Sequence, residues 1–303
     1  MIRHFLDLHD LTSQDLQLIL SHAHQLKRSR NDAPHTMPLA GRSIAMIFEK
    51  NSTRTRVSFE VGIRELGANP VVLLANDLQL GRGETIADTA RVLSRYVHAI
   101  MMRATLHEKV EELARCATIP IINGLTDRSH PCQIMADLMT VEERLGTFSD
   151  LTVLWAGDGN NVLNSWISAA AAFGFHLRMA NPPAFRPHQD YLKRAYDIGA
   201  KLSFHENIME AAKNVDVVVT DTWVSMGHEH SEMRRTLLAP YQVNDAIMHN
   251  AAPHALFLHC LPAHRGEEVT ASVLDGTQSA VWDEAENRLH VQKAIMLWCL
   301  EQI

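Results

Sequence analysis

The chain has 303 residues, of which 46% are hydrophobic and 21% are charged, and its formal net charge is -7. This length fits two domains of about 150 residues, and the composition is that of a globular protein with a sizeable core. A net acidic chain without a basic tract argues against nucleic acid as a partner. The sequence has no apolar run of the length needed to span a membrane, which argues against a membrane partner.

The N-terminus and the cysteines both indicate a cytoplasmic protein. Asp7 and Asp10 interrupt the apolar stretch that a signal peptide would need. The four cysteines are widely spaced and include no C-x-x-C pair, a pattern typical of free thiols in a reducing compartment; they are Cys116, Cys132, Cys260 and Cys299. We therefore expect a cytoplasmic location.

Predicted strands and helices alternate through the first half of the chain. An amphipathic helix with Thr12 or Ser13 as its cap comes first. Strands are then predicted at residues 43–48, 71–74, 99–102 and 119–123, with helices at 57–66, 86–96 and 108–116 between them. A longer helix follows, with Ile134, Leu138, Val141 and Leu145 on one face.

The alternation restarts after a turn at residues 146–150. Strands are predicted at 152–156, 176–180, 201–204, 215–220 and 256–259, and helices at 162–173, 191–198, 208–213 and 284–302. Continuous apolar strands that alternate with helices form parallel sheets covered on both faces. The sequence therefore predicts two doubly wound α/β domains, 1–146 and 147–283, with a closing helix at 284–303 that packs back on the first domain. Ligands of such folds bind at the carboxyl ends of strands, so we expect an active-site cleft between the domains.

Five polar residues in a row, Ser52-Thr53-Arg54-Thr55-Arg56, stand between a predicted strand and a predicted helix. Helix N-termini attract anions through their free N–H groups and the helix dipole. Arginine adds a planar fork that matches phosphate oxygens. Capping of the helix is the alternative, but a cap needs only one such residue. The run therefore predicts a phosphate-binding site at the start of a helix.

Two further motifs follow strands of the first domain. His130-Pro131-Cys132-Gln133 opens the long helix, and Arg103 ends a strand. His130 can donate to a carbonyl oxygen, and Gln133 can bind an amide. Taken alone, the same residues have plainer interpretations: Pro131 is a good first helical residue, His130 a polar cap, and Arg103 a surface ion-pair residue.

A glycine-rich loop at residues 157–161, Gly-Asp-Gly-Asn-Asn, follows the first strand of the second domain. It resembles a dinucleotide-binding loop, but Val162 stands at the third glycine position and no acidic residue ends the next strand. We therefore expect no NAD binding. Asn161 is instead a candidate for holding the carboxylate of a small ligand.

Asp221 lies just past the strand at 215–220, and Ser225-Met226-Gly227 follow it closely. A carboxylate at a strand end can bind an ammonium ion, and the Ser-Met-Gly turn offers a hydroxyl and backbone groups. The alternative is that Asp221 caps the following segment and that the rest is a plain loop.

Residues 259–268 follow the last predicted strand and contain Cys260 and His264. A zinc site needs three or four ligands, and no C-x-x-C or second histidine pair is near, so we expect no metal here. A nucleophilic Cys-His pair is also disfavoured, because the phosphate site implies that the nucleophile arrives with a second substrate.

Together these motifs resemble the carbamoyltransferase family. The resemblance extends over essentially the whole chain and is carried, in order, by residues 48–56, 130–133, 221–227 and 259–266. The first two motifs are common to aspartate and ornithine carbamoyltransferases. The Ser-Met-Gly loop and the His-Cys-Leu-Pro run resemble the ornithine type, whereas acetylornithine and putrescine enzymes differ at the Ser-Met-Gly loop.

The resemblance implies a site for each of two substrates. The residues implied for carbamoyl phosphate are Ser52, Thr53, Arg54, Thr55, Gln79, Arg103, His130, Gln133, Cys260, Leu261 and Arg288. The residues implied for L-ornithine are Asn161, Asp221, Ser225 and Met226. Gln79 matches a residue lent by a neighbouring subunit, so the resemblance also implies a homotrimer with active sites at its subunit interfaces.

The implied reaction transfers the carbamoyl group to the δ-amine of L-ornithine and gives L-citrulline and phosphate, in arginine biosynthesis or a urea-cycle-type step. It requires no cofactor or metal, since phosphate is a good leaving group. A lysine-like amine has a pKa of about 10.4 and must lose a proton before it attacks. Arg54, Asp221 and Cys260 are the implied catalytic residues, with His259 and Glu267 as further candidates for assisting proton removal.

Three other functions stay open at this point. The first is a related carbamoyltransferase with another acceptor. The second is a nucleotide-dependent oxidoreductase, which the missing third glycine disfavours. The third is a catalytically silent homologue, which is disfavoured because every motif position is filled.

Overall fold

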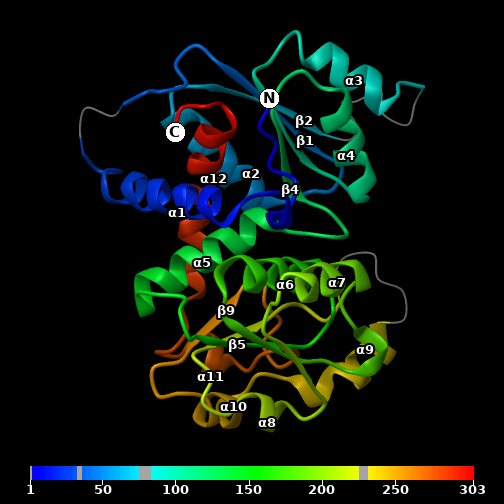
Figure 1. Cartoon of the computed structure of the whole chain (residues 1–303), viewed down its shortest axis with the longest axis vertical. Helices are drawn as coiled ribbons and strands as arrows, with labels where there is room; N and C mark the ends of the chain where they lie inside the picture. Colours follow the sequence, from blue (N-terminus) through cyan, green and yellow to red (C-terminus); the bar gives the residue numbers. More distant parts are fainter. Residues whose placement is uncertain (1, 33–35, 75–82, 225–230) are drawn as a thin grey trace. The chain divides into compact units, whose positions relative to one another are not determined.

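A computed structural model describes residues 2–32, 36–74, 83–224 and 231–303 of the chain (Figure 1). The chain divides into two compact units. Unit 1 consists of Met1–Ala136 and Asn287–Ile303, and unit 2 of Asp137–Glu286. Each unit is built on one parallel sheet, so the predicted α/β fold class is confirmed.

The sheet of unit 1 has four parallel strands in the order β2-β1-β3-β4. They are β1 (Ser43–Phe48), β2 (Asn69–Leu74), β3 (Ala99–Arg103) and β4 (Ile121–Leu125). The order reverses between β1 and β3, and ligands of doubly wound sheets bind outside the carboxyl ends of the strands at such a reversal. Phe48 and Arg103 are register partners at the ends of these two strands. The polar residues that follow β1 and β3 therefore share one edge of the sheet.

Helices cover both faces of this sheet. The helices of unit 1 are α1 (Ser13–Arg28), α2 (Thr53–Glu65), α3 (Ile86–Leu93), α4 (His107–Cys116), the start of α5 (Pro131–Leu145) and the end of α12 (Val281–Cys299). α3 and α4 lie on one face, and α2 and α12 on the other (Figure 1). Gly62 of α2 allows the close approach of α12, since a Cβ there would lie 3.1 Å from Lys293 Cγ. This packing places Arg288 of α12 beside the start of α2.

The sheet of unit 2 has five parallel strands in the order β7-β6-β5-β8-β9. They are β5 (Thr152–Ala156), β6 (His176–Ala180), β7 (Leu202–His205), β8 (Val217–Thr220) and β9 (Leu256–His259). The order reverses between β5 and β8. Ala156, Thr220 and His259 are in register at the carboxyl ends of β5, β8 and β9. The loops that follow these three strands therefore meet at one edge.

The faces of the second sheet are also covered by helices. α6 (Asn161–Phe173) and α7 (Gln189–Asp197) lie on one face, and α8 (Ile208–Ala211), α10 (Asp245–Asn250) and α11 (Ala271–Leu274) on the other (Figure 1). α9 is Ser231–Leu238, and three short 3-10 helices are η1 (Leu8–Asp10), η2 (Pro183–Phe185) and η3 (Ala239–Tyr241). Trp166 of α6 and Phe175 pack edge to face, with ring centroids 5.8 Å apart, in the core between α6 and the sheet.

Some predicted bounds agree with the structure and others do not. The strands predicted at 43–48, 152–156, 176–180 and 256–259 have those bounds. The helix predicted at 57–66 was wrong at its start, because the polar run at 53–56 forms the first turn of α2. β4 lies two residues later than predicted, after Pro120, and α12 begins at Val281 rather than at residue 284. α9, α10 and α11 were not predicted.

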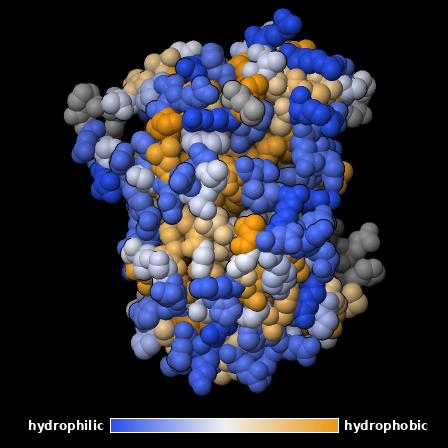
Figure 2. All heavy atoms as spheres, in the orientation of Figure 1, coloured by the Kyte–Doolittle hydropathy of each residue, from blue (hydrophilic) through white to orange (hydrophobic). Residues whose placement is uncertain are grey.

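The surface carries few large hydrophobic side chains. On the face drawn in Figure 2, hydrophilic residues predominate and hydrophobic ones form small groups between them. Tyr96 and Ile198 are among the most exposed apolar residues, at 72% and 70%. Such scattered exposure is ordinary for a folded protein. None of the described helices is both long and apolar enough to cross a membrane.

Candidate functional site

The predicted phosphate site lies at the N-terminus of α2. Ser52 is the N-cap, with extended backbone, and its Oγ accepts a hydrogen bond from the Thr55 N–H at 3.4 Å. Thr53 and Arg54 follow in the first turn and are exposed. This turn contains no acidic residue, so no side-chain charge of the turn opposes the positive end of the helix dipole. The geometry suits an anion at this helix start.

The hydroxyl of Thr55 joins two arginines in the same site. Thr55 is 1% exposed, and its Oγ1 accepts hydrogen bonds from Arg103 Nη1 at 3.2 Å and from Arg288 Nη2 at 3.0 Å. Arg288 Nη1 donates to Gln133 Oε1 at 2.7 Å. Residues from α2, β3, α5 and α12 therefore converge on one place. Two guanidinium groups on one hydroxyl form a strongly positive, mostly buried centre.

His130 completes this centre at the start of α5. It is 3% exposed, and burial followed by the positive charges of Arg288, Arg103 and Arg54 holds its pKa well below the ordinary value. The imidazole is therefore neutral near pH 7. A neutral imidazole carries one N–H donor, which can serve a carbonyl oxygen.

Cys132, two residues further on, has a structural role. Its Sγ donates to the backbone carbonyl of Asn123 at 3.3 Å, and burial raises the pKa of the thiol to about 12. A buried thiol of this kind is unreactive. The histidine and glutamine of the motif therefore face the site, whereas the cysteine anchors α5 to β4.

The predicted acceptor site lies at the carboxyl edge of the second sheet. Asp221 directly follows β8 and is 8% exposed. Its Oδ2 accepts from Asn160 Nδ2 at 2.6 Å, and its Oδ1 accepts from Cys260 Sγ at 3.0 Å and from the Thr222 N–H at 2.7 Å. Asn160 is the N-cap of α6, and Asn161 is the first residue of that helix. The structure therefore brings Asn161, Asp221 and Cys260 to the same edge.

The thiol of Cys260 acts here as a hydrogen-bond donor. Burial is the main reason that its pKa lies well above the ordinary value, and the charge and hydrogen bond of Asp221 raise the pKa further, as do Glu284 and Asp137. A thiol with a raised pKa keeps its proton near pH 7 and cannot accept one. This geometry favours a role in orienting Asp221 over a role as general base.

His259 and Glu267 do not donate to or accept from Asp221 in this arrangement. His259 is fully buried, its Nδ1 accepts from the Leu261 N–H at 2.9 Å, and its Nε2 donates to Glu268 Oε1 at 3.1 Å. Burial alone would raise the pKa of Glu268, but hydrogen bonds from His259 and the His264 N–H together lower it. Glu267 pairs with Arg235 at 3.1 Å. These contacts shape the chain around Leu261, whose φ of 55° is left-handed.

Potential metal-ligand atoms come together in two groups of the described residues. One is Asp221, His259 and Cys260, and the other is His264, Glu267 and Glu268. Cys260 and His264, the pair considered from the sequence, fall in different groups. In the first group both nitrogens of His259 are in hydrogen bonds with Glu268 and the Leu261 N–H, and Cys260 donates to Asp221, so each of the three side chains already has a hydrogen-bond partner.

The glycines of the loop at 157–161 have a packing role. A Cβ on Gly159 would lie 2.4 Å from the backbone carbonyl carbon of Arg186, and Gly157 has a φ of 126°. Both positions therefore require glycine for local reasons. The dinucleotide-like spacing follows from this close approach of two backbone segments.

Sequence reasoning missed Asp158 and Arg234. Asp158 is 8% exposed and forms an ion pair with Arg234 of α9, 76 positions further along the chain. No local pattern connects an arginine in an unpredicted helix with this loop. Three predicted site residues, Gln79, Ser225 and Met226, lie outside the described residues.

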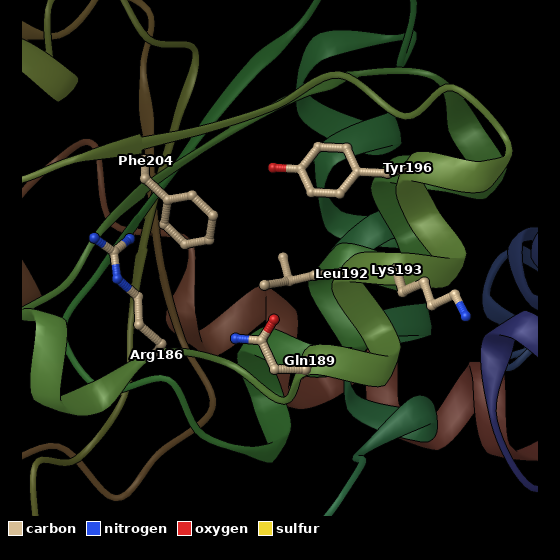
Figure 3. Close-up of a pocket in the computed structure, with 6 residues that line it drawn as sticks. All are labelled: Arg186, Gln189, Leu192, Lys193, Tyr196 and Phe204. Atoms are coloured by element: carbon tan, nitrogen blue, oxygen red, sulfur yellow. The ribbon is translucent and has the colours of Figure 1, made fainter.

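A separate surface pocket lies between α7 and β7, at the edge of the second sheet (Figure 3). It has a volume of about 490 Å³ and is lined by Arg186, Gln189, Leu192, Lys193, Tyr196 and Phe204. The guanidinium of Arg186 stacks on Phe204, 4.2 Å from the ring centroid, and the Lys193 side chain points away from the hollow (Figure 3). None of the predicted site residues that the structure describes lines it, so this pocket is distinct from the two sites described above.

Two family models together match nearly the whole chain. The carbamoyl-P binding domain of aspartate/ornithine carbamoyltransferase matches residues 3–143, and the Asp/Orn binding domain of the same family matches residues 149–299.

Relatives of known name match the chain over its full length. Ornithine carbamoyltransferase of Rhizobium meliloti is 53% identical over 300 residues, which are 99% of each chain. That of Agrobacterium fabrum is 53% identical over 298 residues, or 98% of each chain.

Solved structures agree with these relatives. Ornithine carbamoyltransferase from Pyrococcus furiosus superposes with a TM-score of 0.95 at 47% identity, covering 99% of this chain and 98% of that one. The anabolic enzyme from Campylobacter jejuni has a TM-score of 0.92 at 39% identity, with 100% of both chains covered. The chain therefore belongs to the aspartate/ornithine carbamoyltransferase family.

Proposed function

We propose that the chain transfers the carbamoyl group of carbamoyl phosphate to the δ-amine of L-ornithine, giving L-citrulline and phosphate. The observation that carries the proposal is the convergence of Arg103 and Arg288 on the hydroxyl of Thr55, at an anion-binding helix start. Relatives that are 52–54% identical over the full chain are ornithine carbamoyltransferases, which supports this acceptor.

Carbamoyl phosphate is assigned to the site in unit 1. The helix start holds the phosphate through Ser52, Thr53, Arg54 and Thr55. The carbamoyl group lies against Arg103, His130, Gln133 and Arg288. His130 is neutral and can donate its N–H to the carbamoyl oxygen without adding a further positive charge. In the proposed trimer Gln79 of a neighbouring subunit completes the site.

Ornithine is assigned to the site in unit 2. Its α-carboxylate is assigned to the side chain of Asn161, the first residue of α6. Asp221 attracts the ammonium groups, and Ser225 and Met226 are proposed as further contacts. Cys260 and Leu261 are proposed to contact the reacting carbamoyl group. Transfer requires the two substrates to meet.

The reaction is an acyl transfer in which one bond forms and one breaks. The neutral δ-amine attacks the carbamoyl carbon, a C–N bond forms, the C–O bond to phosphate breaks, and the departing phosphate takes up the proton that the amine nitrogen loses. Negative charge develops on the carbonyl oxygen and on the leaving phosphate. Arg54, Arg103 and His130 are positioned to stabilise it, and one such donor commonly contributes about 3 kcal/mol. Asp221 orients the amine.

The biological setting is part of the proposal. We assign the reaction to arginine biosynthesis, because an anabolic ornithine carbamoyltransferase superposes over the whole chain. Four free cysteines support a cytoplasmic location. A homotrimer is proposed from the resemblance of Gln79 to a residue shared between subunits.

Acceptor competition tests the proposed function. The purified chain is assayed with carbamoyl phosphate and, in turn, L-ornithine, N-acetylornithine, putrescine and L-aspartate, with the carbamoylated products measured by mass spectrometry. We expect kcat/KM to be at least about a hundredfold higher for ornithine than for the other acceptors, because the site recognises one carboxylate and two ammonium groups in the same molecule. Arg54→Ala serves as the inactive background. A higher kcat/KM for any other acceptor, or no turnover with ornithine, contradicts the proposal.

A further inference from the structure

Asp158 is a second buried carboxylate close to Asp221. It follows β5 in the loop that also carries Asn160, the residue that donates to Asp221. The charge of Asp221 acts on Asp158, and together with burial, the larger effect, it raises the pKa of Asp158 to about 6. Two carboxylates at one edge of a sheet repel each other, and this repulsion would displace each of them from its position.

Arg234 of α9 opposes this repulsion and ties two loops together. Its Nη2 donates to Asp158 Oδ2, and its Nε donates to the backbone carbonyl of Trp223 at 2.9 Å. The guanidinium also lies 4.4 Å from the ring centroid of Phe185. Arg234 is only 15% exposed and Asp158 11% exposed in their side chains, so water screens the pair weakly. One planar fork therefore connects the loop after β5 with the segment Asp221–Trp223 after β8.

We propose that Arg234 is the positioning residue for Asp221: it neutralises Asp158 and fixes the main chain at Trp223, so that Asp221 presents its carboxylate to the acceptor amine. This inference rests on the proposed function, in which Asp221 orients ornithine. Arg234 donates to Asp158 and Trp223 and not to Asp221, so it acts through them. A guanidinium fork is needed for two directed bonds, which a lysine ammonium would not reproduce.

Steady-state kinetics separate this role from a general structural one. In Arg234→Met we expect the KM for ornithine to rise roughly tenfold or more, as for loss of ground-state binding, while the KM for carbamoyl phosphate changes less than about twofold. Arg234→Lys keeps the charge and should give an intermediate KM, which also provides a test if the methionine variant folds poorly. Arg235→Met is the matched control, since Arg235 is adjacent, 46% exposed and paired with Glu267. It should leave both KM values unchanged.

A double variant tests the neutralisation of Asp158. If Arg234 offsets the charge of Asp158, then adding Asp158→Asn to Arg234→Met should restore part of the lost ornithine affinity. The groups that act on Asp158 are Arg234 from α9 and Asp221 after β8. Since Arg234 lowers the pKa of Asp158, this carboxyl group should take up a proton at higher pH in Arg234→Met than in the wild type. Protonation removes the same charge as Asp158→Asn, so the raised ornithine KM of Arg234→Met should fall as the pH drops through that pKa, and the double variant should lack this dependence. A double variant no better than Arg234→Met, together with a KM ratio between the two that does not change with pH, would overturn the inference.

A readout without turnover keeps this test apart from the test of the proposed function. Asp221 raises the pKa of the Cys260 thiol through a direct hydrogen bond. A displaced Asp221 would lower that pKa, so iodoacetamide should modify Cys260 faster in Arg234→Met than in the wild type, as followed by peptide mass spectrometry. Failure of the wild type to use ornithine contradicts the proposed function alone. An unchanged Cys260 rate together with an unchanged ornithine KM in folded Arg234→Met overturns the positioning role.

Discussion

At the scale of single residues, the hydrogen bond between Cys260 and Asp221 determines whether the thiol can act as a nucleophile or a base. The thiol donates to Asp221, and three carboxylates act on it in a partly buried setting, so its pKa lies well above the ordinary value. A nucleophilic or basic cysteine needs the opposite surroundings, with positive charge nearby. In this site the S–H group of Cys260 acts as a hydrogen-bond donor. The acceptor is the carboxylate of Asp221, the residue proposed to orient the amine.

Cys260→Ser should therefore keep most of the activity, whereas Cys260→Ala should not. Serine retains a donor for Asp221, so we expect the KM for ornithine to stay within a few-fold of the wild type. Alanine leaves the carboxylate without that donor, and a hydrogen bond to a charged group contributes about 1.5–3 kcal/mol, or roughly a tenfold or greater rise in KM. Initial-rate kinetics across pH 6–9 measure both variants. Equal loss of turnover in the two variants would show that sulfur chemistry is required.

Contacts between residues far apart in the sequence could be predicted where short motifs follow parallel strands. Thr55, Arg103, Gln133 and Arg288 converge because strand ends share an edge and α12 packs on α2. Arg234 could not be predicted, because it lies in a helix that was not predicted and nothing near it in sequence marks its pairing with Asp158. Pairings of this kind depend on tertiary packing, which a single sequence does not display.

At the scale of elements, the N-terminus of α2 is both a capped helix start and the proposed phosphate site. Substitutions of Ser52 can separate these two roles. Ser52 caps the helix through the Thr55 N–H and also lies at the proposed phosphate position. A cap requires an acceptor, and either a hydroxyl or a carboxylate supplies one. A phosphate site tolerates the hydroxyl and is opposed by a carboxylate, since two anions repel.

Ser52→Ala should therefore be the less stable of two variants at this position, and Ser52→Asp the one that binds carbamoyl phosphate more weakly. We expect Ser52→Ala to lower the free energy of unfolding by about 1 kcal/mol, and Ser52→Asp to leave it near the wild-type value, because aspartate caps well and favours the helix dipole. Carbamoyl phosphate affinity should fall in Ser52→Ala and fall much further in Ser52→Asp. Urea unfolding and calorimetric titration with carbamoyl phosphate measure the two properties.

The N-cap of α1 provides the control for this comparison. Thr12 accepts from the Asp15 N–H at 3.1 Å and is exposed. Thr12→Ala should lower the free energy of unfolding, as Ser52→Ala does, without any change in carbamoyl phosphate affinity. Retained affinity in Ser52→Asp would rule out phosphate at the start of α2.

The bounds of an element were predictable where its hydrophobic pattern was clear. β1, β5 and β9 are largely apolar runs, whereas polar and apolar residues alternate in most of β6, and the ends of all four strands were predicted correctly. The predicted start of α2 was wrong because the polar residues in its first turn show no periodic pattern of apolar residues. α10 and α11 have six and four residues, too few for a periodic signal.

At the scale of the whole molecule, the proposed trimer makes each active site the product of two chains. A closed ring of identical subunits repeats one heterologous contact, so every site would receive Gln79 from the same neighbour. A chain that lacks its own Asp221 would still lend a normal Gln79. A chain that lacks Gln79 would still supply a normal acceptor site.

Two inactive variants should therefore restore each other when their subunits mix. Gln79→Ala and Asp221→Asn are purified separately, then dissociated and reassembled together in equal amounts. A complete site forms wherever a Gln79→Ala chain receives its neighbour's residue from an Asp221→Asn chain, which random mixing in a ring gives at about a quarter of sites. Citrulline formation should thus return to about a quarter of the wild-type rate. Each variant reassembled alone should stay inactive, and sedimentation should show three chains per particle. A mixed sample no more active than the two variants alone would mean that Gln79 acts within its own chain or at no site, and the shared active site would have to be abandoned.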